Sequence, residues 1–504
     1  MIRTELIRPV HELVLANAGS QGSRTAFDDS SRATTWAELA DRTARLASGL
    51  RELGVGAGDR VGMYMSNGVA AVESYLAISR AGAIGVCLNP QLTAREAQYM
   101  LADSGSVVLI ADAERARTIE PVRSELPDLR HVAVVDGEWY TGVGRESDAA
   151  PDSLKLDDTA WILYTSGTTG RPKGVQLTQR GMLWVVAGWV PILGLSAQDR
   201  FLSPLPLFHS YALNVSVLAV AALGASERVM ERFTTEETFR LLREDSITFL
   251  PGVPTMFNYL VRSGGDLTGS RLRVCISAGA ILPSEVNRQF EERYGIPLLD
   301  CYGITETSTF VTFNWLTGHR THGSCGLPLL GLCARVVDPA TGVDRPAGVS
   351  GELIVRGPLV TPGYWNRPES TAEAIRDGWY HTGDLAMCDE NGYLTIVGRV
   401  KELIISGGYN IAPAELEDVA LTHPSVVDCA AVGVPDEMKG EVPVLFVCWR
   451  DGRDQSDQLM AHLRGGLARY KLPARLATID QVPRTGSGKI LRYQLKALEA
   501  TPGS

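Results

Sequence analysis

The chain has 504 residues, 45% of them hydrophobic and 21% charged, which is too long for one simple hydrophobic core and predicts a large body with a smaller second domain. Its 58 acidic and 48 basic residues give a formal net charge of −10, which disfavours nucleic acid and anionic membrane surfaces as partners and favours small molecules. The eight cysteines lack the paired spacing of disulfide scaffolds or zinc sites, which predicts reduced thiols in the cytoplasm.

Neither the N-terminus nor the most apolar stretches have the pattern of a targeting or membrane segment. Glu5 and Arg8 interrupt residues 1–16, so no signal peptide is expected. The apolar stretches 184–197 and 213–225 are shorter than the roughly 20 residues that span a membrane. We therefore expect no transmembrane segment, and we interpret both stretches as buried core.

Helical and strand-like segments alternate through the first third of the chain. Residues 36–53 are expected to form a helix, because apolar side chains recur on one face from Trp36 to Leu50, and only Thr43 interrupts this stripe. Further helices are predicted at 70–79 and 94–102, and strands at 61–65, 84–86, 107–110 and 161–164. This alternation predicts an α/β fold with largely parallel sheets. The polar stretch 145–158 is interpreted as a loop or a joint between subdomains.

The pattern changes near the end of the chain. Residues 353–400 contain short β-like segments, at 351–355 and 393–397, separated by glycine and proline. The following part is again mixed, with helices predicted at 414–422 and 455–468 and strands at 426–434 and 442–447. We place a domain boundary near Lys401, between residues 1–400 and 401–504.

A glycine- and hydroxyl-rich segment directly follows the predicted strand 161–164. Residues 164–174 read YTSGTTGRPKG, a composition that lets backbone N–H groups approach an oligophosphate closely. Hydroxyl donors and a positive charge come from Ser166, Thr168, Thr169 and Lys173. The segment is not a Walker loop, because Pro172 occupies the position of the second glycine. It predicts a site for nucleotide phosphates.

This segment resembles the phosphate loop of the adenylate-forming superfamily, which contains acyl-CoA synthetases, peptide-synthetase adenylation domains and beetle luciferases. Motifs similar to others of that family follow in the same order at 206–210 (PLFHS), 302–306 (YGITE), 380–384 (YHTGD), 398–402 (GRVKE) and 483–489 (PRTGSGK). The N-terminal third fits through 35–39 (TWAEL) and 80–83 (RAGA). The resemblance covers essentially the whole chain.

The resemblance implies a fold and an activity. Residues 1–400 would form an adenylation core of αβ-layered subdomains plus a β-rich subdomain, which binds ATP and the acid. Residues 401–504 would form a small mobile α+β lid domain that carries the catalytic lysine. The implied enzyme is an AMP-forming acyl-CoA synthetase, an acid–thiol ligase that uses ATP, Mg²⁺ and coenzyme A.

The resemblance also implies residues that bind ATP. Glu306 would hold Mg²⁺ on the triphosphate, and Thr305 would contact the α-phosphate. Tyr302 would stack on adenine, while Asp384 would accept the ribose hydroxyls. The complete implied set is Thr165, Ser166, Gly167, Thr168, Thr169, Lys173, Ala278, Gly279, Ala280, Tyr302, Gly303, Asp384 and Arg399.

Lys489 is the residue that we expect to promote adenylation. The carboxylate substrate is already a nucleophile, but it must approach a polyanion, so a lysine and Mg²⁺ would act by neutralising charge. By resemblance, rotation about a hinge at Lys401 then removes Lys489 and brings Gly407 and Gly408 to form a thiol tunnel.

The acid pocket is expected from the same resemblance. His209, grouped with the catalytic residues, is similar to the family's gate over the acyl group and is not expected to be a general base. The lining candidates are Phe208, Tyr211, Asn214, Ala278, Gly303, Ile304, Phe310 and Val311. They are neutral and mostly apolar, which favours an aliphatic or aromatic monocarboxylic acid over a dicarboxylate.

Alternative functions stay open at this point. Because the sequence ends shortly after Lys489 with no carrier domain, we expect free coenzyme A as acceptor. A separate carrier protein or an amine would fit the same adenylation motifs, as would activated nitrite for diazotisation of an aryl amine. A silent nucleotide-binding scaffold is a third hypothesis, and homodimer formation is left open.

One further cluster suggests a metal site. His319, His322 and Cys325 stand at three-residue spacing with Cys333 beyond them, a set of residue types that binds zinc. No paired Cys-x-x-Cys accompanies them, and the segment around Cys325 resembles a turn of the family.

Overall fold

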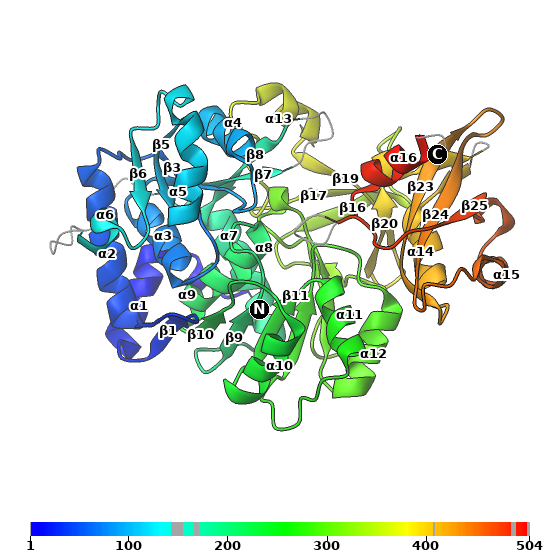
Figure 1. Ribbon diagram of the computed structural model, residues 1–504, viewed down its shortest axis with the longest axis horizontal. Helices are drawn as coiled ribbons and strands as arrows, with labels where there is room; N and C mark the ends of the chain where they lie inside the picture. The colour runs from blue at the N-terminus through cyan, green and yellow to red at the C-terminus, as the bar shows by residue number, and fades with distance from the viewer. Residues whose placement is uncertain (1, 143–154, 166–170, 407–408, 485–489, 501–504) are drawn as a thin grey trace.

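The computed structural model describes residues 2–142, 155–165, 171–406, 409–484 and 490–500. Figure 1 shows a large domain, from the blue N-terminal helices to the yellow strands, beside a smaller orange and red domain. In the described part of the chain, three β-sheets belong to the large domain and a fourth belongs to the small domain. This arrangement confirms the expected α/β fold with a large N-terminal and a small C-terminal domain.

A six-stranded sheet forms the first part of the large domain. Its order is β6 (His131–Val134), β5 (Ser106–Ala111), β3 (Arg60–Tyr64), β4 (Ile84–Cys87), β7 (Thr159–Thr165) and β8 (Lys173–Thr178). All neighbours are parallel except β7 and β8, which pair in antiparallel fashion. The accompanying helices are α2 (Trp36–Glu52), α3 (Val69–Arg80), α4 (Ala94–Ser104), α5 (Ala113–Ile119) and α6 (Glu138–Gly142), with a 3-10 turn η2 (Glu120–Glu125). The predicted alternation of helices and strands is confirmed.

The helix α2 illustrates why these predictions succeed. Thr35 and Glu38 form a reciprocal capping box at its start, which satisfies backbone N–H groups of the first turn. The apolar face is buried from Trp36 to Leu50. Thr43 is also buried, and its hydroxyl donates to Ala40 O at 3.2 Å, so the polar residue in the stripe has an internal partner.

A nine-stranded sheet lies beside the first. Its order is β15 (Leu327–Pro328), β14 (Thr312–Phe313), β13 (Leu298–Tyr302), β12 (Val274–Ser277), β11 (Phe249–Gly252), β9 (Arg200–Ser203), β10 (Ser226–Val229), β1 (Thr25–Asp28) and β2 (Ala33–Thr35). The strands from β1 to β13 in this order are parallel, and β2, β14 and β15 are antiparallel to their neighbours. Parallel strands end at one common edge, where α/β folds build their sites.

Helices of the same region supply the core. They are α1 (Val10–Gln21), α7 (Gln179–Leu193), α8 (Ser210–Ala212), the π-helix η3 (Leu213–Leu218), α9 (Ala219–Leu223), α10 (Thr235–Glu244), α11 (Pro254–Ser263) and α12 (Ser284–Tyr294), with the 3-10 turns η1 (Thr4–Leu6) and η4 (Thr305–Thr307). Most residues of α7, η3 and α9 are buried, so the apolar stretches 184–197 and 213–225 do lie in the core. No helix among the described residues is long and apolar enough to cross a membrane.

The third sheet is antiparallel and completes the large domain. It contains β16 (Cys333–Val337), β17 (Gly351–Arg356), β19 (Trp379–Cys388), β18 (Ile375–Arg376) and β20 (Leu394–Arg399), and α13 (Pro368–Ala374) precedes β18. The helix α13 lies near α4 at the top of Figure 1, where Arg367 pairs with Asp103.

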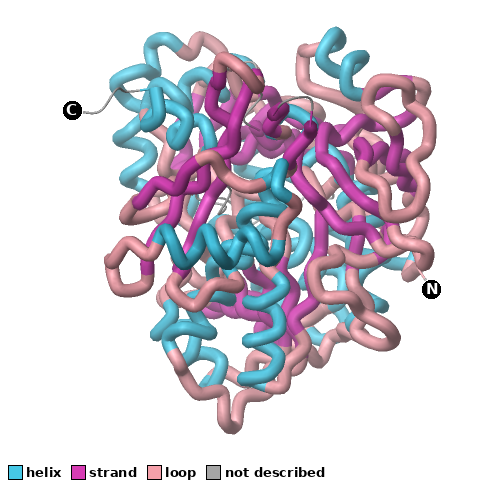
Figure 2. Tube along the Cα trace, turned by 90° about the vertical axis from the view of Figure 1, so that its right-hand side faces the viewer, coloured by secondary structure: helices cyan, strands magenta, loops and turns pink. Residues whose placement is uncertain are grey.

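The small domain has its own sheet and its own hydrophobic clusters. The sheet order is β22 (Tyr409–Ile411), β21 (Ile404–Ser406), β24 (Gly440–Trp449) and β23 (Val426–Asp436), with β25 (Arg475–Thr478) paired to β24. Its helices are α14 (Pro413–Leu421), α15 (Ser456–Gly466) and α16 (Arg492–Ala500), with a 3-10 turn η6 (Arg469–Lys471), and η5 (Val400–Glu402) joins it to β20. Figure 2 views the molecule from the side of this domain. The boundary at Lys401 stays a prediction; it falls between the third and fourth sheets.

Candidate active site

Three residues predicted to bind the nucleoside converge where the second and third sheets meet. The hydroxyl of Tyr302, at the end of β13, donates to Asp384 Oδ2 at 2.5 Å. Arg399 Nε lies 3.0 Å from Asp384 Oδ1, because β19 and β20 pair these residues directly. A carboxylate has about four acceptor positions, so this one keeps free capacity for two further hydroxyl donors.

The charge states of this trio follow from burial and proximity. Burial, and then the neighbouring Asp384 carboxylate, raise the pKa of Tyr302 well above its usual range, so the phenol stays neutral and donates. The same carboxylate raises the pKa of Arg399. Asp384 is only 4% exposed and has this guanidinium as its cationic partner. The trio therefore holds a carboxylate in a fixed position, with acceptor positions that Tyr302 and Arg399 do not occupy.

An irregularity in the pairing of β17 with β19 positions Asp384. Gly383 has φ 69°, a left-handed conformation that favours glycine. Its N–H donates to Glu352 Oε1 at 3.2 Å, while Glu352 Oε2 lies 2.9 Å from His381 Nδ1. The buried Glu352 thus holds this part of β19 from β17, and sequence reasoning missed it because no local motif marks it.

A strained loop carries Thr305 and Glu306. Ser308 and Thr309 have φ values of 55° and 117°, which are unfavourable for residues other than glycine. Ser308 Oγ donates to Leu359 O at 2.8 Å and Thr309 Oγ1 donates to Ser210 O at 2.9 Å, so neighbouring segments hold this conformation. Gly303 is required as well, because a Cβ there would lie 1.5 Å from Thr309 O.

The side chain of Glu306 has a defined partner. Tyr364 donates its hydroxyl to Glu306 Oε1 at 3.0 Å, and the ammonium of Lys173 lies 5.4 Å from the centre of the Tyr364 ring. Among the described residues no cation is within ion-pair distance of Glu306. Oxygen ligands of this kind suit Mg²⁺, so the carboxylate fits the predicted metal role.

The phosphate loop is partly described. Thr165 ends β7 and pairs with Lys173 at the start of β8. The predicted residues Ser166, Gly167, Thr168 and Thr169 lie outside the described residues. The described flanks of the predicted phosphate loop therefore lie side by side, with Thr165 opposite the lysine predicted to contact phosphate.

The predicted adenine wall follows β12. Ala278 is buried, and its N–H donates to Gly252 O at 3.2 Å. Because Ser277 pairs with Asp300 in parallel strands, Gly279 and Ala280 begin at the same sheet edge as Tyr302. The geometry therefore brings the wall and the aromatic ring to one edge.

The acid-pocket candidates surround the ends of β11, β12 and β13. Tyr211 donates its hydroxyl to Gly252 O at 3.2 Å or to Ile276 O at 3.3 Å, and its ring meets Phe310 edge to face at 5.6 Å between centroids. His209 precedes α8, and its Nδ1 accepts from Tyr211 N at 3.3 Å. The structure thus brings gate and pocket candidates together.

Not all of these candidates are equally accessible. Asn214 lies in the π-helix η3 and is fully buried, with its Oδ1 accepting from Trp189 Nε1 at 3.1 Å. Phe310 and Val311 are also fully buried, whereas Phe208 and Ile304 are partly exposed. Asn214, Phe310 and Val311 therefore lie in the core, and only the partly exposed candidates are accessible. A π-helix often marks a functional site, but periodicity does not predict it.

The small domain meets the large one near α11. Arg262 of α11 donates to Val427 O at 2.8 Å across the interface. A cavity of about 620 Å³ is lined from both domains, by Met256 and Tyr259 on one side and by Pro483 and Arg484 on the other. Lys489, Gly407 and Gly408 lie outside the described residues.

The zinc alternative is not supported. Cys325 is buried, and its Sγ points to Leu394 O at 3.2 Å, while His319 and His322 are exposed. In the ranges that the structure describes, no group of three His, Cys, Asp or Glu residues could hold a metal ion. Although the three residues stand at regular spacing in the sequence, Cys325 is in the core and His319 and His322 face solvent, so they cannot ligate one ion together.

Comparison with known proteins identifies the family. The model of the AMP-binding enzyme family matches residues 14–365, and that of the AMP-binding enzyme C-terminal domain matches residues 415–489. The chain belongs to the AMP-binding enzyme family. A feruloyl-CoA synthase from an Amycolatopsis species is 38% identical over 487 residues, which cover 94% of this chain and 95% of that protein.

Further members agree with this assignment. The 2-succinylbenzoate–CoA ligase of Geobacillus sp. strain WCH70 is 35% identical over 477 residues, covering 94% of each protein. The crystal structure of ATP-bound MatB from Rhodopseudomonas palustris has 31% identity and a TM-score of 0.91, covering 97% of this chain and 98% of that one. These findings confirm the prediction of an AMP-forming acid–thiol ligase that uses ATP and coenzyme A.

Proposed function

We propose that this enzyme activates an aromatic monocarboxylic acid as its acyl-adenylate and transfers the acyl group to coenzyme A. The observation that supports the acid class is a neutral aromatic cluster among the pocket candidates, in which Phe310 contacts both Tyr211 and Trp189 edge to face. The candidate lining residues include no Lys or Arg that would pair with a second carboxylate. The relative named for a feruloyl product supports an aryl acid as well.

The ATP would bind along the common sheet edge. The ribose hydroxyls would donate to the acceptor positions of Asp384 that Tyr302 and Arg399 leave unoccupied. Adenine would stack on Tyr302, and Lys173 would attract the phosphates. Glu306 would hold Mg²⁺, which supplies charge neutralisation on the triphosphate when bound. The carboxylate of the acid then approaches the α-phosphorus from the aromatic pocket, with Thr305 beside the α-phosphate.

The second half-reaction would use the small domain. We propose Lys401 as the hinge because it lies in η5, between the last strand of the large domain and the first of the small sheet. Lys489 would serve adenylation, and Gly407 and Gly408 would serve the thiol. Arg484 and Ile490 form a β-bridge, so the two ends of the segment that carries Lys489 are held together. All eight cysteines are free thiols, which fits a cytoplasmic enzyme.

Competition among acids tests the substrate class. We would incubate the enzyme with ATP, Mg²⁺ and coenzyme A and an equimolar mixture of benzoic, hydroxycinnamic, straight-chain fatty and dicarboxylic acids, and identify the thioesters by mass spectrometry. An aryl thioester as main product is expected. A main product from a fatty or dicarboxylic acid would contradict the proposed class. Adenylate without thioester would favour a carrier protein or an amine as acceptor.

A further inference from the structure

We propose that Tyr364 is a positioning residue that fixes the Glu306 carboxylate for the metal and Lys173 for the phosphates. This inference rests on the proposed metal role of Glu306. The Tyr364 hydroxyl donates to Glu306 Oε1 at 3.0 Å, and its ring centre lies 5.4 Å from Lys173 Nζ. One side chain thus contacts the carboxylate on its polar end and the ammonium on its aromatic face.

The direction of the hydrogen bonds around Tyr364 is fixed. A carboxylate only accepts hydrogen bonds, so the Tyr364 hydroxyl is the donor to Glu306 Oε1. Tyr380 is buried, and its hydroxyl lies 3.2 Å from that of Tyr364. Since the hydroxyl hydrogen of Tyr364 is used in the hydrogen bond to Glu306, the hydrogen bond between the two phenols must be donated by Tyr380. This chain holds one oxygen of Glu306 and leaves the other for a cation.

The backbone around Tyr364 ties the same two elements together. Thr361 N donates to Glu306 O at 2.7 Å, and Thr361 Oγ1 donates to Gln176 O of β8 at 2.6 Å. Tyr364 itself bridges to Val175 in antiparallel fashion. Residues 361–364 therefore connect the strand that begins at Lys173 with the turn that contains Glu306. A shift of the strand or of the turn would move Tyr364 as well.

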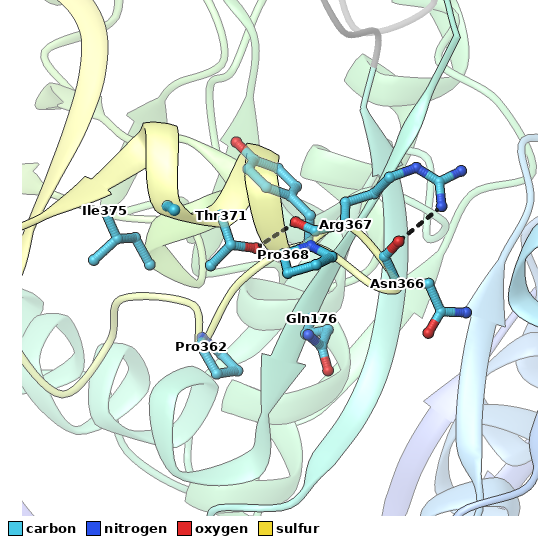
Figure 3. Close-up of a pocket in the computed structure, with 9 residues that line it drawn as sticks. Gln176, Pro362, Asn366, Arg367, Pro368, Thr371 and Ile375 are labelled. Atoms are coloured by element: carbon cyan, nitrogen blue, oxygen red, sulfur yellow. Dashed lines mark hydrogen bonds between the residues drawn. The ribbon is translucent and has the colours of Figure 1, made fainter.

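The surroundings of Tyr364 permit substitution. It lines an open hollow of about 530 Å³ with Gln176, Pro362, Thr371 and Ile375. Figure 3 shows these four side chains around the hollow, with Arg367 extending away from it toward Asn366. Because the hollow opens to solvent, a smaller side chain at position 364 leaves no sealed cavity. Variants at this position should therefore fold.

The hydroxyl and the ring can be tested separately. We would measure binding of a non-hydrolysable ATP analogue by calorimetry, with Mn²⁺ and with EDTA, and bound Mn²⁺ by electron paramagnetic resonance. Tyr364→Phe should weaken Mn²⁺ binding in the nucleotide complex by about tenfold and leave metal-free nucleotide binding within twofold. Tyr364→Leu, which also removes the ring, should in addition weaken the metal-free complex, because Lys173 loses its aromatic contact.

Two reference variants make the result decisive. Tyr380→Phe removes the phenol that contacts Tyr364 but not Glu306, so Mn²⁺ binding should weaken by less than in Tyr364→Phe. Glu306→Gln should weaken it most. Unchanged Mn²⁺ binding in Tyr364→Phe alongside a loss in Glu306→Gln would overturn the positioning role and leave the proposed metal role standing. Unchanged binding in Glu306→Gln would overturn both.

Discussion

The hydroxyl of Tyr302 donates to Asp384 Oδ2 at 2.5 Å, although the two residues stand 82 positions apart and belong to different sheets. This bond joins the carboxyl edge of the nine-stranded sheet to the antiparallel third sheet. It places a neutral aromatic donor and an ion-paired carboxylate side by side. The proposed nucleoside site therefore lies at the junction of two sheets.

Substitution of Asp384 should weaken nucleotide binding. Asp384→Asn removes the charge that pairs with Arg399 and leaves a weaker acceptor for ribose, so ATP affinity should fall about tenfold or more. Calorimetric titration with ATP measures this change. Glu390→Gln, at an exposed position on the same hairpin, is the matched control and should bind like wild type. Affinity of Asp384→Asn within twofold of wild type would contradict the assignment.

Gly303 should not tolerate a side chain. In Gly303→Ala the new methyl group would overlap Thr309 O, so the strained loop that carries Glu306 must move and pyrophosphate release should be lost. Gly19→Ala is the matched control, because a Cβ at that helical position meets nothing within 4 Å, and it should raise the free energy of unfolding by up to about 1 kcal/mol. Thermal unfolding and pyrophosphate assays would reveal the difference. An active Gly303→Ala enzyme would mean that the loop is not under this constraint.

Glu227 should make stability depend on pH. Glu227 is fully buried on β10, and neither of its carboxylate oxygens has a hydrogen-bond partner in the described structure. The nearby hydroxyl of Ser216 is hydrogen-bonded to Ser203 Oγ instead, at 2.7 Å. Burial raises the pKa of Glu227 well above its usual range. The folded protein thus keeps a proton that the unfolded chain loses above about pH 4.3, so its stability falls by about 1.4 kcal/mol per pH unit from there toward the folded pKa.

Glu227→Gln removes this pH dependence. The variant should become more stable than wild type as pH rises from 5 to 8, which chemical unfolding at both pH values would measure. Glu236→Gln, at an exposed position, should track wild type at both. An equal stability difference between Glu227→Gln and wild type at the two pH values would count against a buried neutral carboxyl group.

The buried and the partly exposed candidates for the acid pocket should respond differently to substitution. Asn214→Leu leaves the buried Trp189 Nε1 without its acceptor, which costs about 1 to 3 kcal/mol, and removes the side-chain donor to Met182 O, a carbonyl inside helix α7. It should lower the melting temperature at unchanged acid preference. Ile304→Ala, at a partly exposed position, should leave the melting temperature unchanged and shift kcat/KM between large and small acids by about tenfold. A changed acid preference in Asn214→Leu and a lowered melting temperature in Ile304→Ala would instead assign Asn214 to the pocket lining and Ile304 to the core.

Much of the fold follows from local pattern. The helix 36–53 and the strands beside it could be predicted because capping and apolar periodicity agree there. The π-helix at 213–218 could not, because its residues are buried on every side and give no period. The polar joint predicted at 145–158 lies mostly outside the described residues.

The site divides in the same way. Tyr302, Glu306, Asp384 and Arg399 stand in motifs that could be read directly. The supporting residues Glu352 and Tyr364 lie 31 and 58 positions from their partners Gly383 and Glu306, and only the folded chain brings them into contact. The zinc hypothesis at Cys325 failed for a related reason, since spacing does not tell which side chains enter the core.

One product analysis tests the central claim most directly. The enzyme would be incubated with ATP, Mg²⁺ and a hydroxycinnamic acid, with and without coenzyme A, and pyrophosphate, AMP, ADP and thioester would be quantified. We predict acid-dependent pyrophosphate with enzyme-bound acyl-adenylate in the absence of coenzyme A, and equal amounts of AMP and thioester in its presence. Formation of ADP, or an adenylate that coenzyme A never converts to a thioester, would contradict the account.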